Sequence, residues 1–422
     1  MANKELFRLI SLALMLALVL TGTDLRVAQA DPGWYDAAWA YRKKITVDNT
    51  KVSATLTDFP VLISLSSDTD LASDAQDDGD DILFTASDGV AKLSHEIESF
   101  NGTSGQLVAC VKVPSLSSSA DTDIYMYYGH AGAGNQQNAT FVWDSNYMMV
   151  QHLQETTGGA NAIQNSTSNT NHGTDTNDPT LGATGKIDNA ITFDGTNDFI
   201  AIADSSSLDT SGNITIEAWI KHANMNNVEH IISHHDSTAK TGYLLNQFSN
   251  NNFRAQLGNG VAAWPAVSAE STNAYTDSNA WYYVVFTSDG TTWRFYVNGA
   301  ADGSGSTVSI AASTKDVWIG DDVNAPATRY WEGTIDEVRI SDTARTDDWI
   351  QVSYNNQQYP DKAVHGASGF FSLGSEDSGA PTAVGGVVYR VNRINVLAPW
   401  LFLILALSFA ITRGAFQLRK SA

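Results

Sequence analysis

The sequence predicts an all-β protein built from two β-sandwich domains. Short runs rich in β-branched and aromatic residues alternate with Gly, Asn, Asp and Ser turns over most of the 422 residues. No sustained helical periodicity appears between the apolar stretches near the two ends. The roughly 345 residues between these stretches exceed one ordinary domain, which favours two. We expect one helix at each end, a signal helix and a transmembrane helix.

Residues 1–30 have the three parts of a secretory signal peptide. Lys4 and Arg8 precede the apolar run 9–20, and Ala28-Gln29-Ala30 supplies small residues for cleavage. Twelve apolar residues are too few to span a bilayer core of about 30 Å. We therefore expect cleavage after Ala30, with an uncleaved anchor as the alternative.

Residues 394–412 form an uncharged stretch of transmembrane length, bounded by Arg393 and Arg413. Trp400 suits an interfacial aromatic anchor. The segment 376–393, with several Gly residues and a Pro, predicts a flexible linker. The sequence therefore predicts an exported protein, anchored in the cell membrane by a C-terminal helix, with its bulk outside and a cytoplasmic tail at 413–422.

The net charge limits the possible partners, and the cysteine content limits how the fold can be stabilised. A formal net charge of −22 repels nucleic acid and is compatible with calcium and neutral glycans. The chain has one cysteine, so it cannot form an intramolecular disulfide. Cys110 lies in the apolar run 107–113 and is expected to be a buried, inert thiol.

The first domain is predicted at 31–145. Its expected strands are 42–47, 59–65, 82–85, 96–100, 106–113 and 123–128. Four carboxylates surround Gly79 in the segment 77–81. This pattern allows a calcium hypothesis, but it lacks EF-hand spacing and favours a solvated acidic turn.

The second domain is predicted at 146–375. Its expected strands are 190–193, 199–203, 214–221, 229–233, 243–248, 253–257, 281–288, 292–297, 316–319 and 334–340. Apolar and other residues alternate along 214–221, as in a half-buried strand. A short helix is expected at 347–355, covering a sheet edge.

Several motifs extend these predictions to known families. Trp39-Ala-Tyr-Arg-Lys-Lys-Ile-Thr-Val-Asp48, His95-Glu-Ile-Glu98 and Tyr125-Met-Tyr-Tyr-Gly129 resemble DUF2341, a domain of unknown function in prokaryotic surface proteins. The segments 190–199, 214–220, 281–285, 293–299 and 333–341 resemble LamG-like jelly rolls of the concanavalin A-like lectin and glucanase superfamily. The second resemblance implies a jelly roll, whose members bind sugars, proteins or calcium, or cleave glycans.

The chain lacks the acid spacing that the resemblance implies for a hydrolase. Retaining glycosidases need two carboxylates about 5 Å apart, and this superfamily delivers them from one strand with a third acid between them. Glu96 and Glu98 lie in the first domain, and Asp336 and Glu337 are neighbours expected to face opposite sides of a strand. We therefore expect no enzyme activity.

Asp194, Asp198 and Asp336 are the candidate calcium ligands, and calcium is the only cofactor that the sequence favours. Asp336 shares strand parity with apolar neighbours, so its carboxylate should be buried and should need a metal or hydrogen-bond donors. The alternative is that backbone amides satisfy it. His230 and His234 would lie about 13 Å apart on one strand, which argues against zinc there.

Trp264, Tyr330 and Trp331 are the candidate glycan-binding aromatics. They lie in segments with loop character, and flat rings of this kind stack on sugars, although packing is the ordinary alternative. The leading hypothesis is a non-catalytic surface binding or adhesion protein whose LamG-like domain engages an extracellular glycan or a surface protein. The alternatives are a purely structural envelope component and, less favoured, a glycan-active hydrolase.

Overall fold

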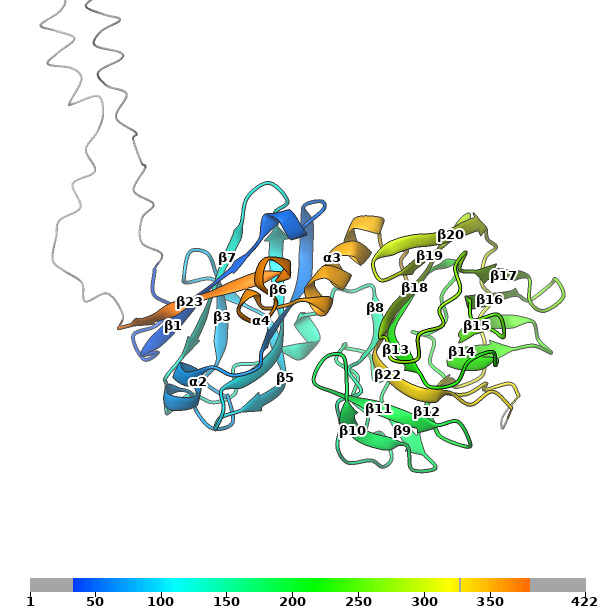
Figure 1. Ribbon diagram of the computed structural model, residues 1–422, viewed down its shortest axis with the longest axis horizontal. Coiled ribbons are helices and arrows are strands. Elements are labelled where there is room, and N and C mark those ends of the chain that lie inside the picture. The colour runs from blue at the N-terminus through cyan, green and yellow to red at the C-terminus, as the bar shows by residue number, and fades with distance from the viewer. Residues whose placement is uncertain (1–32, 326–327, 380–422) are drawn as a thin grey trace, which may run out of the picture. The chain divides into compact units, whose positions relative to one another are not determined.

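The computed structural model describes residues 33–325 and 328–379, all of which fall in one compact unit. Figure 1 shows two groups of sheets in this unit with helix α3 (Asp347–Gln358) between them. The predicted signal peptide at 1–30 and the predicted membrane helix at 394–412 lie outside the described residues. Among the helices of the described ranges, none has the length and apolar character needed to cross a membrane.

The first sandwich packs a five-stranded sheet, in the order β23-β1-β7-β3-β4, against a three-stranded sheet, β2-β6-β5. The strands are β1 (Tyr41–Val47), β2 (Leu56–Leu65), β3 (Leu83–Ala86), β4 (Lys92–Leu93), β5 (His95–Asn101), β6 (Gln106–Leu116), β7 (Thr122–Tyr128) and β23 (Phe371–Ser378). All pairings are antiparallel. Cys110 is buried on β6, as predicted.

The second sandwich is larger. Its eight-stranded sheet has the order β10-β11-β22-β13-β18-β19-β20, with β8 also paired to β22, and its seven-stranded sheet has the order β17-β16-β15-β14-β21-β12-β9. The first sheet contains β8 (Tyr147–Gln151), β10 (Thr180–Thr184), β11 (Asn189–Asp194), β13 (Asn213–His222), β18 (Tyr282–Asp289), β19 (Thr292–Val297), β20 (Ala300–Ser306) and β22 (Glu332–Ser341). The second contains β9 (Gly173–Thr176), β12 (Phe199–Ile202), β14 (Glu229–Asp236), β15 (Thr241–Gln247), β16 (Phe253–Asn259), β17 (Val267–Glu270) and β21 (Val317–Ile319).

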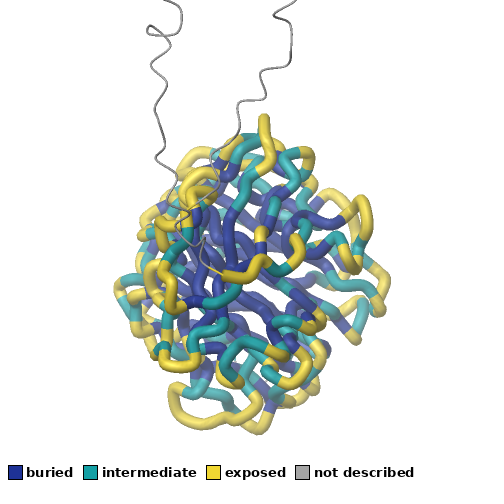
Figure 2. The backbone as a smooth tube through the Cα atoms, turned by 90° about the vertical axis from the view of Figure 1, so that its left-hand side faces the viewer, coloured by how far each residue is buried: buried dark blue, intermediate teal, exposed yellow. Residues whose placement is uncertain are grey.

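Alternating apolar side chains build the core of each sandwich. On β13, Ile214, Ile216, Ala218 and Ile220 all enter the core between the two large sheets. Figure 2 shows the buried strands inside and the exposed loops around them. The all-β sandwich prediction is thus confirmed. The remaining helices are short: α2 (Thr69–Asp74), α4 (Lys362–His365), and the 3-10 turns Asn49–Lys51, Ala139–Phe141 and Gly366–Ser368.

The end of the described chain returns to the first sandwich, which differs from the predicted boundary at residue 375. β23 pairs with β1 along its length, from Tyr41 opposite Ser378 to Val47 opposite Phe371. Without β23, β1 would be an unpaired sheet edge. The sequence placed most of this strand in the second domain and its end in the linker, because its Gly, Ser, Glu and Asp residues resemble a loop.

Helix α3 joins the two sandwiches and covers the free edge of β2. Asn356 of α3 accepts a hydrogen bond from Leu62 N at 2.7 Å and donates one to Leu62 O at 2.9 Å, as a neighbouring strand would. Trp349 packs edge-on against Phe59 at 4.9 Å. On the other side, Ile350 enters the apolar cluster around Trp219 on β13. The predicted helix at 347–355 is therefore present and extends to Gln358.

We expect Asn356→Leu to destabilise the protein by about 2–4 kcal/mol, because it leaves the buried N–H and C=O of Leu62 without partners. Denaturant unfolding of the full chain measures this change. Gln351→Leu, at an exposed position of the same helix, is the matched control and should shift stability by no more than about 0.5 kcal/mol. Equal effects of the two substitutions would contradict this role of Asn356.

Candidate functional site

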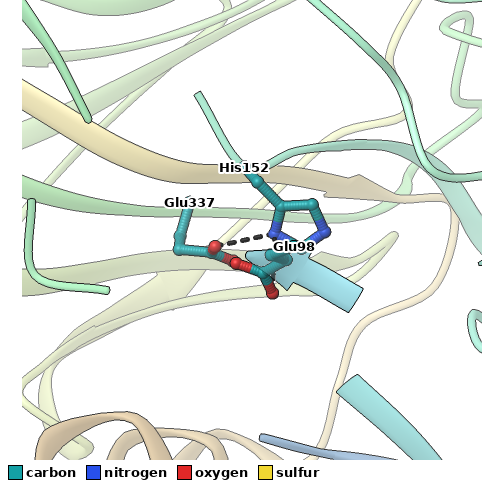
Figure 3. A group of neighbouring side chains, drawn as sticks. All are labelled: Glu98, His152 and Glu337. Atoms are coloured by element: carbon teal, nitrogen blue, oxygen red, sulfur yellow. Dashed lines mark hydrogen bonds and ion pairs between the residues drawn. The ribbon is translucent and has the colours of Figure 1, made fainter. Parts of the chain in front are cut away.

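A group of buried acidic and basic side chains lies where the two sandwiches meet. Glu98 comes from β5 of the first sandwich, whereas His152, just after β8, and Glu337 of β22 belong to the second. Figure 3 shows the imidazole of His152 facing both carboxylates. We call Glu96, Glu98, His152, Glu337 and Arg339 the interface cluster.

Two β-bulges direct the acids of the interface cluster toward the contact. The pairing of β5 with β6 passes from Ile97 to Ser99, so Glu98 is an extra residue in its strand. Glu337 lies at a similar irregularity between β22 and β13 and has a left-handed φ of 53°. A left-handed conformation is uncommon for a glutamate and costs backbone energy, so the surrounding structure must hold Glu337 in place.

The distances within the interface cluster are short. His152 Nδ1 lies 2.7 Å from Glu337 Oε1 and 3.3 Å from Glu98 Oε1. On the other side of the ring, Nε2 lies 3.5 Å from Glu96 Oε2. Glu337 also binds Arg339 through its second oxygen, and Cys110 Sγ lies 3.3 Å from Glu98 Oε1. One imidazole thus faces three carboxylates.

Burial and charge shift the pKa values of the cluster in opposite directions. Burial raises the pKa of Glu98 to about 8. For Glu337 the effect of burial is outweighed by the charges of His152 and Arg339, which lower its pKa. Burial opposes a charge on His152, but the surrounding carboxylates raise its pKa well above the usual value. The geometry therefore holds an ionised Glu337 against a cationic ring and keeps Glu98 protonated near neutral pH.

The sequence alone did not bring these residues together. Glu96 and Glu98 were set aside because they lie in the first domain, and Glu337 was expected to point away from the face of Asp336. The alternation in His95-Glu-Ile-Glu98 was a usable signal, because two acids two residues apart share one face of a strand. Their partner His152 lies 54 residues further along the chain, beyond the predicted domain boundary.

A second group of polar residues lies on the outer face of the seven-stranded sheet. His230, Asn246, Arg254 and Glu270 are register partners on β14, β15, β16 and β17, and we call them the polar row. Their strands send the alternate side chains, such as Tyr243, Leu245 and Ala255, into the core. Four adjacent strands thus carry polar side chains in one line across this face.

Several buried atoms along the polar row have no hydrogen-bond partner in residues 33–325 and 328–379. These atoms are His230 Nδ1, His235 Nδ1, Asn246 Oδ1 and Arg254 Nε. Burial lowers the pKa of His235 to about 4, so its ring is neutral at physiological pH and can both donate and accept. Buried polar groups normally have partners, so this face provides hydrogen-bonding capacity for water or a polar ligand.

Trp264 and Tyr330 lie beside this face. The ring of Trp264 stacks on His235 at 4.7 Å, with 9° between the planes. Tyr330 lines a pocket of about 580 Å³ together with Arg329 and Glu229, next to the turn at Gly195 and Thr196. Arg329 connects this pocket to the polar row, since its Nη1 lies 3.5 Å from His230 Nε2. Burial raises the pKa of Glu229 to about 7.

Trp331 does not have the position predicted for a ligand-binding aromatic. Its side chain is 0% exposed and belongs to the core of the second sandwich, where it stacks on His222 at 6.3 Å. Trp331 follows Tyr330 directly and precedes β22, so the chain turns it inward while Tyr330 lines the pocket. The prediction for Trp331 is wrong.

The three candidate calcium ligands do not form one site. Asp194 is opposite Glu332, and Ile191 is opposite Ile335, which places Asp336 at the other end of β11. Asp336 Oδ2 accepts hydrogen bonds from Lys186 N at 2.8 Å and Ile187 N at 2.9 Å, the backbone-amide alternative considered above. Asp336 therefore does not join Asp194 and Asp198 in one site, and backbone amides occupy one of its oxygens.

Asp194 and Asp198 lie together in the turn between β11 and β12. Asp198 Oδ2 accepts a hydrogen bond from Asp194 N at 3.1 Å, and Asp194 Oδ1 accepts one from Thr196 N at 2.7 Å. These are ordinary turn contacts. Calcium binding at this turn stays a prediction.

Two parts of the chain match known protein families. Residues 78–172 match DUF2341, a domain of unknown function, and residues 194–351 match the concanavalin A-like lectin/glucanases superfamily. The chain carries a DUF2341 segment followed by a concanavalin A-like segment. This order confirms the predicted resemblances. The first match continues past residue 145 and includes His152 as well as Glu96 and Glu98.

Some solved structures are similar to part of this chain at low sequence identity. Domain 4 of an extracellular arabinanase from Geobacillus stearothermophilus, in complex with arabinotriose, is 19% identical, with 49% of this chain and 97% of that chain covered and a TM-score of 0.38. The botulinum neurotoxin serotype D binding domain is 15% identical, with 52% and 53% covered and a TM-score of 0.40. The chain spans about half the length of that domain. The comparison with curated proteins gave no match.

We expect Asp336→Asn to leave stability within about 1 kcal/mol of wild type, whereas Asp336→Ala lowers it by about 1–3 kcal/mol. Burial raises the pKa of Asp336 well above its usual range, which favours the neutral form, and an amide can replace a neutral carboxyl group. The Asn oxygen can still accept from the amides of Lys186 and Ile187, but Ala cannot. Thermal and denaturant unfolding measure both variants, and equal losses would contradict a neutral Asp336.

The difference in stability between wild type and His235→Gln is expected to depend on pH. Because the folded-state pKa of His235 is about 4, the unfolded chain takes up a proton below pH 6.5 that the folded chain excludes. The stability contributed by the neutral ring is therefore lost as pH falls from 6.5 toward 4. The stability advantage of wild type over the variant should shrink by about 1–2 kcal/mol between pH 7 and pH 5. Denaturant titrations at both pH values check this, and a constant difference would exclude a neutral buried His235.

Proposed function

We propose that this chain is a non-catalytic cell-surface binding protein that engages an extracellular glycan through the outer face of its seven-stranded sheet. The pocket beside the polar row carries the proposal, because Tyr330, Arg329 and Glu229 line it and the part-exposed ring of Trp264 lies beside the same face. Glycan recognition needs this combination, a flat apolar surface for sugar C–H groups and directional polar groups for hydroxyls.

The opposite sheet of the second sandwich supports the choice of face. Trp219, Tyr283 and Tyr296 of the eight-stranded sheet pack against Ile350 of α3. Glu337 and Arg339 of the same sheet face Glu98 and Trp143. This surface is therefore covered within the chain, whereas the seven-stranded sheet carries the polar row and the pocket.

The cellular location of the protein is part of the same proposal. An exported chain held by an apolar segment at 394–412 would present the second sandwich to extracellular glycans. Secretion of the protein lacking residues 394–422, compared with membrane retention of the full chain, tests this address by cell fractionation. Retention of the full chain in the cytosol would contradict it.

A glycan array with the purified full chain, with and without calcium, tests the binding function. We expect a restricted set of glycans to bind, and Trp264→Ala to weaken that binding about tenfold through loss of the stacking surface. Phe141→Ala is the matched control, because Phe141 is an exposed aromatic of the first sandwich, 65% exposed, outside this face. It should leave binding unchanged.

Each other outcome of the array has a defined meaning. If no glycan on the array binds the protein, with or without calcium, this would contradict glycan binding and favour a purely structural envelope component. Equal weakening by Trp264→Ala and Phe141→Ala would contradict the assigned face. Turnover of a polysaccharide would contradict the non-catalytic part of the proposal.

A further inference from the structure

If Glu98 were ionised and His152 neutral, the interface cluster would contain more buried negative charge than Arg339 alone can balance. Glu98 and Glu337 have side chains that are almost fully buried, and Glu96 adjoins them across His152, whereas Arg339 is the guanidinium that contacts Glu337. Buried charges are normally paired or coordinate metals. With a neutral His152, the three carboxylates and Arg339 leave two negative charges, which either two protons or one divalent cation would balance.

The geometry around His152 favours a metal ion. Its Nδ1 points at two carboxylate oxygens, at 2.7 Å and 3.3 Å, and one N–H cannot donate a straight hydrogen bond to both. Nδ1 and the two Oε1 atoms of Glu98 and Glu337 all lie within 4.8 Å of one another. A zinc ion with bonds of about 2.0–2.2 Å needs ligand atoms roughly 3–3.5 Å apart, which small side-chain shifts would provide.

The partners of the ligand-residue atoms that would not bind the metal, such as His152 Nε2, provide an independent observation for the site. A metal-binding histidine usually orients its second ring nitrogen against a carboxylate. His152 Nε2 is buried, lacks a hydrogen bond within the described residues, and faces Glu96 Oε2 at 3.5 Å. Trp143 Nε1 donates to the same Glu96 oxygen at 3.0 Å, and Ser166 donates to the other. Arg339 holds the second oxygen of Glu337 in the same way.

We propose that Glu98 Oε1, His152 Nδ1 and Glu337 Oε1 bind one divalent transition-metal ion, such as zinc, between the two sandwiches. One imidazole with two carboxylates suits such ions. The site is buried, with side chains of His152 and Glu337 that are 4% and 1% exposed, so the ion is structural. Because Glu98 belongs to the first sandwich and the other two ligands to the second, the ion links them directly.

Metal analysis of the untagged full chain tests this inference. After dialysis against zinc and then against metal-free buffer, we expect about one zinc per chain by mass spectrometry and an increase in Tm of about 5 °C. Cobalt at the same site should give visible absorption bands that zinc abolishes. The absence of bound zinc, together with a Tm unchanged by zinc and by chelator, would overturn the proposal.

Glu98→Gln separates a metal from protons. If Glu98 only carries a proton, the neutral amide replaces it and both stability and zinc response match wild type. If Glu98 binds the ion, zinc content falls below about a tenth per chain and the Tm increase is lost, while circular dichroism shows a retained fold. Glu376→Gln, a carboxylate of β23 outside the cluster, is the matched control and should retain zinc. Zinc retention by Glu98→Gln would contradict the assigned ligands.

Discussion

The covering of the eight-stranded sheet is the constraint on which the rest of the structure depends. The second sandwich has two outer faces, and α3 and the first sandwich cover one of them. Trp219 on this face is fully covered by α3. Its Nε1 donates to Gln357 of α3 at 2.5 Å, and its ring lies in the cluster with Ile350. After α3 the chain returns to pair β23 with β1, and the seven-stranded sheet is the other outer face of the second sandwich, where we propose the glycan site.

The charged residues of the interface cluster lie between the two sandwiches, where apolar packing would be expected. Removing one member of a buried charged group leaves another charge without compensation, which makes the arrangement sensitive to relative position. Glu98 and His152 belong to different sandwiches, so their 3.3 Å separation exists only when both sandwiches are in register. The interface cluster therefore specifies one docking geometry, whereas Trp349 and Ile350 of α3 add apolar contacts to the two sandwiches.

Much of the fold could be predicted because alternation and turn chemistry are local. The expected strands at 42–47 and 214–221 correspond to β1 and β13, and the helix at 347–355 corresponds to α3. β23 was missed because a strand with Gly374, Ser375 and Glu376 lacks the apolar alternation on which prediction relies. Its strand conformation comes from pairing with β1, more than 300 residues earlier in the chain.

The candidate sites show the same limit at the level of single residues. Tyr330 and Trp331 are neighbours with the same apparent loop context, yet one lines a pocket and the other is core. Asp336 and Glu337 are also neighbours, and a bulge sends one to backbone amides and the other to His152. Strand parity decides such cases only when the register is regular, and a bulge redirects the side chain at its extra residue. Both acids that face His152 Nδ1 lie at bulges, so the feature that defeated prediction is also the one that assembles the interface cluster.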